Sequence, residues 1–259
     1  TLLDGDGNIP SQLWPLLETM KDRDIAFVPA SGRQCTTLST MFHSHLQGMP
    51  IIAENGTYVV RDGIDISSSL IDPNLAHEVI TGVRQLRDDG HDVGLVVDTK
   101  SMAYLERGDD PFVSHVATYY HSHTVVKDLT EHTDNVIKLS IYDFDEASDT
   151  THPTMQRIAR EHQVILATPN WVDIMNPGVN KGSAVEAVQR DLGVTAGQTA
   201  IFGDFLNDLE MMPMAKWSFA MANSHPDIIR ASNYVAPPNT DNGVITVLSA
   251  LLGVNVPTI

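Results

Sequence analysis

The alternation of short apolar runs with helical stretches is the feature that most constrains the fold of this chain. Near the start, the apolar run "DIAFVPASGR" is followed by the helix-like "QCTTLSTMFHSHL", the apolar run "PIIAENG" and the hairpin-like "TYVVRDGIDI". Strands that alternate with helices in this way are typical of a parallel sheet with helices on both faces. The pattern therefore predicts an α/β fold.

The pattern changes in the middle of the chain and then returns. From about residue 74, a helix followed by paired strands occurs twice, which is typical of an α+β layer with antiparallel pairing. After Pro177 the first pattern resumes with the strand "TAIFGD" and the helix-like "LNDLEMMPMA". We therefore predict a discontinuous α/β core, residues 1–73 and 177–259, interrupted by an α+β cap, residues 74–176.

Composition excludes several classes of function. The 259 residues carry a formal charge of −17 with only 16 Lys and Arg, which argues against broad binding of nucleic acid. No apolar run is long enough to span a membrane, and no basic and apolar leader is apparent at the start. The single cysteine, Cys35, excludes an internal disulfide framework. These features predict a cytoplasmic location without membrane or nucleic-acid partners.

Candidate site residues follow from the rule that parallel α/β sheets bind ligands at the carboxyl ends of their strands. In "PASGR", Ser31 and Gly32 form a small-residue turn before a helix, which suits phosphate. In "AENG", Asn55 ends another apolar run. Each turn has a structural alternative, because such turns also occur without any ligand.

Two later stretches carry charge at equivalent places. In "NPGVNKGSA", Lys181 opens a helix, where it opposes the helix dipole but can reach a phosphate as a point charge. In "IFGDFLNDLEMM", Asp204 ends an apolar strand, and Asn207 and Asp208 follow within one turn. Two carboxylates and an amide suit Mg²⁺. The alternative, that an aspartate only caps the helix, explains one of the two acids.

Taken together, these motifs resemble the Cof-type branch of the haloacid dehalogenase superfamily, phosphatases with a large α/β cap. The stretches "SGR", "ENG", "GVNKG", "GDFLND" and "FAMANSHPDIIRASNYVAPPNTDNGV" occur in the order and at the spacing of that family. The resemblance covers essentially the whole chain outside the cap. It implies a Rossmann-like core and Mg²⁺-dependent hydrolysis of a small phosphorylated metabolite, such as a sugar phosphate or a phosphorylated cofactor, through an aspartyl-phosphate.

The resemblance also implies a role for each matched residue. Ser31 and the backbone of Gly32 would bind the phosphoryl group, with Asn207 in contact and Asn55 at the pocket edge. Lys181 would neutralise phosphate and nucleophile charge. Asp208 would orient the lysine, and Asp204 would bind Mg²⁺.

The opening "TLLDGDGNIP" departs from the family pattern. Thr1-Leu2-Leu3 matches the residues that close the family's first motif, Asp-x-Asp-Gly-Thr, and the distance from Thr1 to Arg33 fits the family's spacing. Asp4 and Asp6 lack a preceding strand, so "DGDGN" is expected to imitate the catalytic loop. The nucleophile and its partner acid are expected upstream of Thr1.

An alternative function follows from that departure. A protein of this fold without a nucleophile would bind a phosphorylated ligand or regulate another process without catalysis. A dinucleotide oxidoreductase is not indicated, because no G-x-G-x-x-G follows the early strands.

Overall fold

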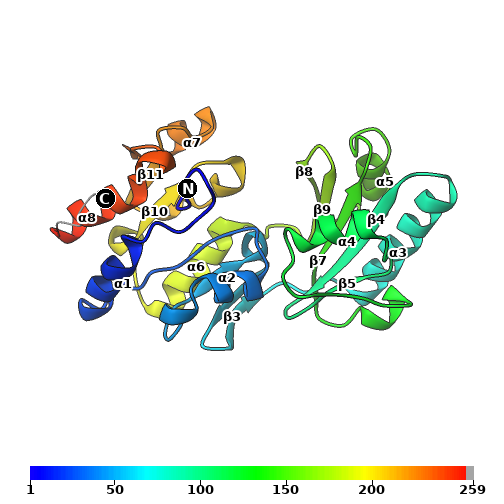
Figure 1. The fold of residues 1–259 in the computed structure, drawn as a ribbon, viewed down its shortest axis with the longest axis horizontal. Coiled ribbons are helices and arrows are strands. Elements are labelled where there is room, and N and C mark those ends of the chain that lie inside the picture. The colour runs from blue at the N-terminus through cyan, green and yellow to red at the C-terminus, as the bar shows by residue number, and fades with distance from the viewer. Residues whose placement is uncertain (255–259) are drawn as a thin grey trace.

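The computed structural model describes residues 1–254, which form two lobes lying side by side (Figure 1). No helix in this range is both long and apolar enough to cross a membrane. The first lobe is built from both ends of the chain. Its elements are α1 (Leu13–Asp22), α2 (Cys35–Met41), β1 (Ile51–Ala53), β2 (Tyr58–Arg61), β3 (Ile64–Ser68), α6 (Lys181–Leu192), β10 (Ala200–Gly203), β11 (Trp217–Met221), α7 (Pro226–Ala231), β12 (Tyr234–Ala236) and α8 (Gly243–Leu252).

The first lobe contains two three-stranded sheets. Strands β10, β11 and β12 are parallel, as the sequence predicts, whereas β1, β2 and β3 pair antiparallel. Helix α1 places Leu13, Leu16, Leu17 and Met20 on one buried face, because residues three and four apart share a side of a helix. That face packs with α8 residues in one apolar cluster.

Two sequence predictions in this lobe are wrong. Residues 25–30 form no strand, and only Ala30 makes an isolated parallel bridge, with Ile52. Pro29 has no N–H to donate to a neighbouring strand. Within the described residues, segment 25–30 makes no other bridge to a strand, so no ladder of hydrogen bonds forms. The stretch "LNDLEMMPMA" forms two 3-10 turns, Leu206–Asp208 and Met212–Met214, instead of one helix, since Pro213 cannot donate an intrahelical hydrogen bond.

The second lobe comes from the middle of the chain. Its elements are α3 (Pro73–Asp88), β4 (Val93–Thr99), β5 (Ala103–Leu105), α4 (Asp110–Ala117), β6 (His123–Val125), β7 (Val136–Asp143), α5 (Thr151–Ile158), β8 (Gln163–Thr168) and β9 (Trp171–Met175). They form a six-stranded sheet of order β6-β5-β4-β7-β9-β8, in which all pairs except β5 with β6 are antiparallel.

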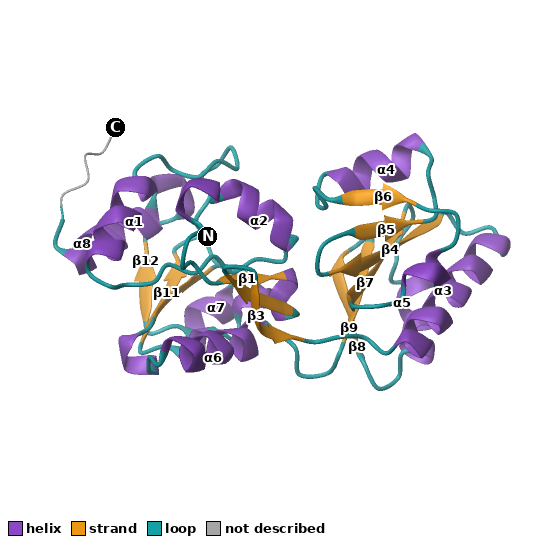
Figure 2. Ribbon diagram, turned by 90° about the horizontal axis from the view of Figure 1, so that it is seen from below, coloured by secondary structure: helices purple, strands orange, loops and turns teal. Residues whose placement is uncertain are grey.

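The two faces of this sheet have different neighbours. Helices α3 and α5 pack on the face that points away from the first lobe, around one large apolar cluster (Figure 2). Helix α3 begins where Asp72 accepts a hydrogen bond from the backbone N–H of Asn74 at 2.7 Å, with Pro73 at its first turn. Helix α4 covers part of the other face through Phe112 and Val116. The rest of that face lies against the first lobe.

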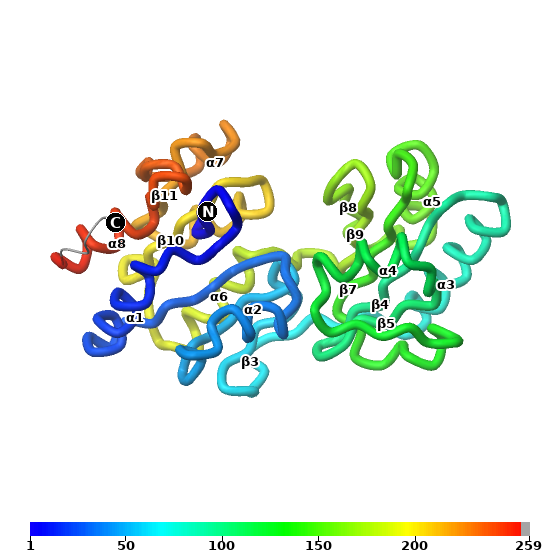
Figure 3. The backbone as a smooth tube through the Cα atoms, in the orientation of Figure 1, coloured from blue at the N-terminus to red at the C-terminus, as the bar shows by residue number. Residues whose placement is uncertain are grey.

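Two connections join the lobes, and they run close together (Figure 3). The chain leaves the first lobe after β3 and returns before α6. The side chain of Asn176 in the second connection donates hydrogen bonds to Leu70 O at 2.7 Å and Ser69 Oγ at 3.0 Å in the first. Hydrogen bonds therefore tie the two connections to each other between the lobes.

The packing of the second lobe predicts a large effect of truncation at Leu139, which is 0% exposed in β7. Leu139→Ala should lower the free energy of unfolding by about 2–5 kcal/mol, because the apolar contacts of a buried leucine are lost and a cavity remains. Chemical denaturation measures this. Leu251→Ala, at a 48% exposed position, should cost less than about 1 kcal/mol. Equal costs at the two positions would contradict the packing described.

Candidate functional site

The loop after β10 carries a buried ion pair. The Lys181 ammonium lies 2.6 Å from Asp208 Oδ1, and the two side chains are 6% and 4% exposed. The second oxygen of Asp208 accepts the backbone N–H groups of Asp204 at 2.9 Å and Phe205 at 3.4 Å. Asp208 therefore fixes both the lysine and the loop that presents Asp204.

The start of α6 is held against this loop by close backbone contact. Asn180 caps the helix by accepting the N–H of Ser183 at 2.9 Å. A Cβ on Gly182 would lie 2.4 Å from the carbonyl oxygen of Glu210, so only glycine allows the approach. Lys181 consequently sits at the positive end of a helix dipole, where an anion is favoured.

The turns after residue 30 and after β1 meet at the same edge. Ser31 accepts the N–H of Asn55 at its carbonyl oxygen, at 3.0 Å, and a Cβ on Gly32 would lie 3.0 Å from the Asn55 amide. The Asn207 amide donates to Asn55 Oδ1 at 3.0 Å. Backbone and side-chain contacts thus join the "SGR", "ENG" and "GDFLND" stretches.

The "ENG" turn has an unusual backbone. Glu54, Asn55 and Gly56 have φ values of 50°, 56° and 97°. Successive left-handed residues that are not glycine are uncommon and concentrate at functional sites. A Cβ on Gly56 would lie 2.4 Å from the carbonyl oxygen of Asn180, so this turn is pressed against the start of α6.

Asp204 is the site's accessible carboxylate, with its side chain 38% exposed. The Thr1 hydroxyl contacts Asp204 Oδ1, and the Thr1 main-chain nitrogen lies 3.0 Å from the same oxygen. The start of the described chain therefore lies beside this carboxylate.

Among the site residues, one carboxylate, that of Asp204, is available as a ligand for Mg²⁺. Mg²⁺ is usually held by one or two carboxylates together with waters and substrate phosphate oxygens. Asp204 can supply one such ligand, since Asp208 is engaged by Lys181 and by backbone N–H groups. No group of three or more potential ligand side chains occurs within residues 1–254.

The structure brings the seven residues singled out by sequence into one region. One group of residues in mutual contact consists of Ser31, Gly32, Asn55 and Asn207. The other consists of Lys181, Asp204 and Asp208. The loop after β10 contributes residues to both groups. Asp4 and Asp6 are not joined to them by hydrogen bonds among the described residues. Asp4 Oδ1 instead accepts the backbone N–H groups of Asp6 at 3.0 Å and Asn8 at 2.8 Å, which closes its own loop.

The sequence did not predict a cluster of three buried charged residues between the lobes, Glu54, Asp98 and Lys138. Glu54 of the first lobe forms an ion pair with Lys138 of β7, and Asp98 of β4 lies 3.9 Å from the same ammonium. A signal was available, because Asp98 in "GLVVDTK" and Lys138 in "VIKLSIYD" each follow an apolar run inside a strand. Charged residues are rarely fully buried unless they are paired.

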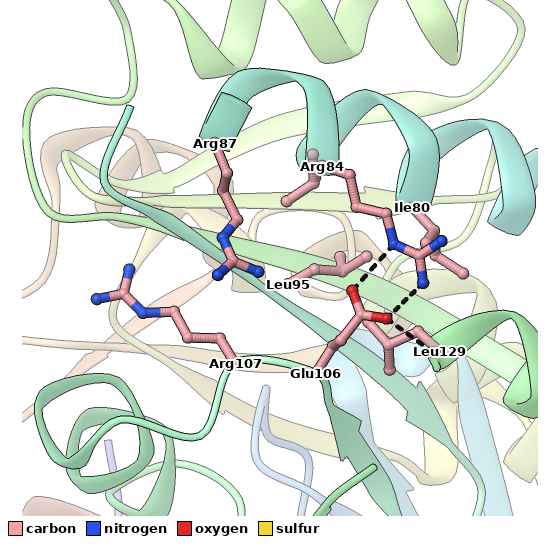
Figure 4. Close-up of a pocket in the computed structure, with 8 residues that line it drawn as sticks. Ile80, Arg84, Arg87, Leu95, Glu106, Arg107 and Leu129 are labelled. Carbon is pink, nitrogen blue, oxygen red and sulfur yellow. Dashed lines mark hydrogen bonds and ion pairs between the residues drawn. The ribbon is translucent and has the colours of Figure 1, made fainter. Parts of the chain in front are cut away.

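The second lobe also contains a small cavity, shown in Figure 4. Its volume is about 10 Å³, enough for one water molecule. Arg84 is bound there by Glu106, and Arg107 pairs with Asp92 and Asp109 at the same end of the lobe. Two of the three guanidinium groups that line it are therefore neutralised, which suits a structural role better than an anion site.

A comparison with protein families identifies the class. The model of the haloacid dehalogenase-like hydrolases matches residues 1–248. The chain therefore belongs to this family of hydrolases.

Individual relatives are similar over most of their length. The chain is 28% identical over 237 residues to the 5-amino-6-(5-phospho-D-ribitylamino)uracil phosphatase YbjI of Escherichia coli, covering 91% of this chain and 86% of that protein. It is 24% identical over 235 residues to the HMP-PP phosphatase of Cronobacter sakazakii, covering 88% and 83%. The crystal structure of TM0651 from Thermotoga maritima shares the fold, with a TM-score of 0.85, 24% identity and coverage of 96% and 93%.

The buried ion pair predicts that removal of the Asp208 charge lowers the free energy of unfolding. Asp208→Asn leaves the Lys181 ammonium buried without its counter-charge, so the free energy of unfolding should fall by about 3–5 kcal/mol. Glu186→Gln is the matched control, because Glu186 pairs with Arg190 on α6, the helix that carries Lys181. The Arg190 and Glu186 charged groups are 3.9 Å apart, and their side chains are 72% and 53% exposed. Loss of that pair should cost about 0.5 kcal/mol or less. Urea denaturation distinguishes the two, and equal effects would contradict the role assigned to Asp208.

Proposed function

We propose that the chain is an Mg²⁺-dependent phosphatase that hydrolyses a small phosphorylated metabolite through an aspartyl-phosphate intermediate. The observation that carries the proposal is the buried Lys181–Asp208 pair beside the Ser31, Asn55 and Asn207 turns. The curated relatives that are named as phosphatases of small phosphorylated compounds support it. The charge of −17 and the single cysteine support a cytoplasmic enzyme without nucleic-acid partners.

We assign the binding of the phosphoryl group to the joined turns. The Ser31 hydroxyl and the Gly32 backbone donate to phosphoryl oxygens, and the Asn207 amide donates beside them. Asn55 borders the substrate, since it contacts both Gly32 and Asn207. These donors fix the phosphorus for attack, which is the main protein contribution in phosphoryl transfer.

We assign the charge balance to Lys181 and Asp208. Lys181 offsets the negative charge that develops on the transferring group, and Asp208 holds the ammonium in place. Asp204 would be the metal ligand from this chain, and bound Mg²⁺ would supply positive charge against the phosphoryl oxygens. Asp208 positions the lysine and does not itself bind the metal.

We propose that the first lobe binds the phosphoryl group and that the second lobe acts on the leaving group. The lobe of residues 1–73 and 177–259 carries every assigned phosphate-binding residue. The lobe of residues 74–176 acts as the cap and faces the site with one side of its sheet, where Lys138 contacts Glu54. This arrangement supports a role of the cap in choosing the leaving group.

The assignment of Asp204 predicts a loss of activity with little loss of stability. Asp204→Asn should lower turnover of an aryl phosphate with Mg²⁺ by at least about 100-fold in a form of the enzyme that includes the residues preceding Thr1. The melting temperature should change little, because the side chain is partly exposed. Asp88→Asn, an exposed carboxylate in the cap, is the control and should leave turnover unchanged. Unchanged turnover and Mg²⁺ dependence in Asp204→Asn would refute the assignment.

The opening loop yields a separate prediction. We propose that neither Asp4 nor Asp6 is the nucleophile, since Asp4 bonds within its own loop and Asp6 is exposed. In the form that includes the preceding residues, Asp4→Ala and Asp6→Ala should each change turnover by less than about twofold. Steady-state kinetics measures this. Turnover that disappears in Asp4→Ala would make "DGDGN" the catalytic loop.

A further inference from the structure

Two buried contacts, here called the interlobe ties, join the first lobe to the cap: Gln34 with Ser122, and Glu54 with Lys138. Gln34 Nε2 donates to Ser122 O at 3.0 Å, and Gln34 Oε1 accepts the Ser122 N–H at 3.0 Å. Glu54 Oε2 accepts a hydrogen bond from Lys138 Nζ. Gln34, Glu54 and Lys138 are 1%, 0% and 3% exposed. Both ties are therefore shielded from water.

The first tie lies at the end of the "SGR" turn. Gln34 follows Arg33 directly and precedes α2, but its side chain makes no hydrogen bond that caps this helix. The side-chain amide has both a donor and an acceptor, and both are used on the backbone of Ser122, just before β6. The cap therefore fixes where the "SGR" turn ends.

The second tie holds a backbone that is unfavourable by itself. Glu54 and Asn55 have φ values of 50° and 56°. A left-handed backbone crowds the Cβ of an L residue against a carbonyl oxygen, so two such residues in succession persist only where their surroundings hold them. Glu54 Oε1 has no hydrogen-bond partner among residues 1–254, so within this range Lys138 is the donor that holds the Glu54 side chain.

The ammonium of Lys138 keeps its charge in this buried position. Burial lowers the pKa of Lys138, but the charge of Glu54 and the other acidic groups nearby raise it well above its usual value. A buried charge is costly unless it is paired. Lys138 and Glu54 therefore constrain each other across the contact between the lobes.

Main-chain hydrogen bonds connect both ties to the residues that we assign to phosphate. The Glu54 N–H donates to Arg33 O at 3.1 Å, and the Asn55 N–H donates to Ser31 O at 3.0 Å. A Cβ on Gly32 would lie 3.0 Å from the Asn55 amide, so the two turns are also packed together. A shift at either tie therefore reaches the "SGR" and "ENG" turns.

We propose that Gln34 and Lys138 are positioning residues that hold the two phosphate-binding turns from the side of the cap. The proposal rests on the proposed phosphatase function, and it assigns neither residue a contact with the substrate. Both residues act through the main chain of the first lobe. Loss of a tie should therefore lower turnover of different phosphate esters by the same factor, whatever the leaving group.

The kinetic test replaces each positioning residue with methionine, an unbranched residue that cannot form the tie. In a form of the enzyme that includes the residues preceding Thr1, Gln34→Met and Lys138→Met should each lower kcat with Mg²⁺ by at least about tenfold, because small displacements from the reactive geometry are costly. The factor should agree within about twofold for phenyl phosphate and glycerol 3-phosphate. KM should change by less than about threefold, because Lys181 and Mg²⁺ still attract the phosphate.

Lys100→Met is the matched control. The Lys100–Asp65 pair also joins the lobes, but it reaches β3 instead of a phosphate-binding turn. The control should change kcat by less than about twofold. A tenfold loss in Lys100→Met would mean that any weakening of the contact between the lobes lowers turnover, and it would overturn the proposal. Unchanged kcat in folded Gln34→Met or folded Lys138→Met would also overturn it.

A double variant separates position from charge balance. Lys138→Met leaves the Glu54 carboxylate buried without its counter-charge, whereas Glu54→Met combined with Lys138→Met removes both charges. The double variant should regain most of the melting temperature lost in Lys138→Met and keep the loss of kcat. Recovery of kcat would mean that the pair only balances charge, and it would overturn the role of Lys138. Gln34→Met changes no charge and tests the proposal even where Lys138→Met does not fold.

Hydrogen exchange gives a measurement that does not depend on turnover. The amides of residues 53–57 should exchange at least about tenfold faster in Lys138→Met than in the unaltered enzyme, and at the unaltered rate in Lys100→Met. Unchanged exchange in Lys138→Met would overturn the proposal even where kcat falls. Absence of turnover in the unaltered enzyme would overturn the proposed function, and the positioning roles with it.

Discussion

The buried contact between Lys181 and Asp208 is the interaction on which the arrangement of the site depends. It joins the start of α6 to the loop after β10, two segments separated by 27 positions in the chain. Asp208 also accepts backbone N–H groups of that loop, so one carboxylate sets the direction of Asp204 and the position of the ammonium. Because α6 presses on the "ENG" turn through Gly56, the same contact influences where Asn55 lies.

This arrangement sets one buried, paired lysine at the start of a helix within a strongly acidic protein. With a net charge of −17, the chain as a whole repels anions. Attraction of a phosphate must therefore come from short-range features: the ammonium of Lys181, the dipole at the start of α6 and amide donors. The pairing with Asp208 fixes the Lys181 ammonium at the start of α6.

The sequence predicted local elements well where the pattern of apolar residues was sufficient. The strand "TAIFGD" was predicted over the residues that form β10, and the helix expected from about residue 74 forms α3. Segment 25–30 failed because a strand requires a partner ladder, and pairing between distant segments is not visible in local pattern. Glu54 was read as part of a turn for the same reason: its partner Lys138 lies 84 positions further along the chain. The site residues could be placed because several motifs occur in one order and at one spacing. Each motif alone also had a structural explanation.

The insertion of one lobe into the other has a consequence for how the chain acquires its structure. The strands of the cap lie within one continuous segment, from β4 to β9, so most of its contacts are between residues close in sequence. The first lobe must join the segment that ends with β3 to the segment that begins with α6, across that whole insertion. Closing so long a loop is entropically unfavourable until its ends are brought together, and a folded cap does this by placing the two connections side by side. A folded cap therefore lowers the entropic cost of bringing the two halves of the first lobe together.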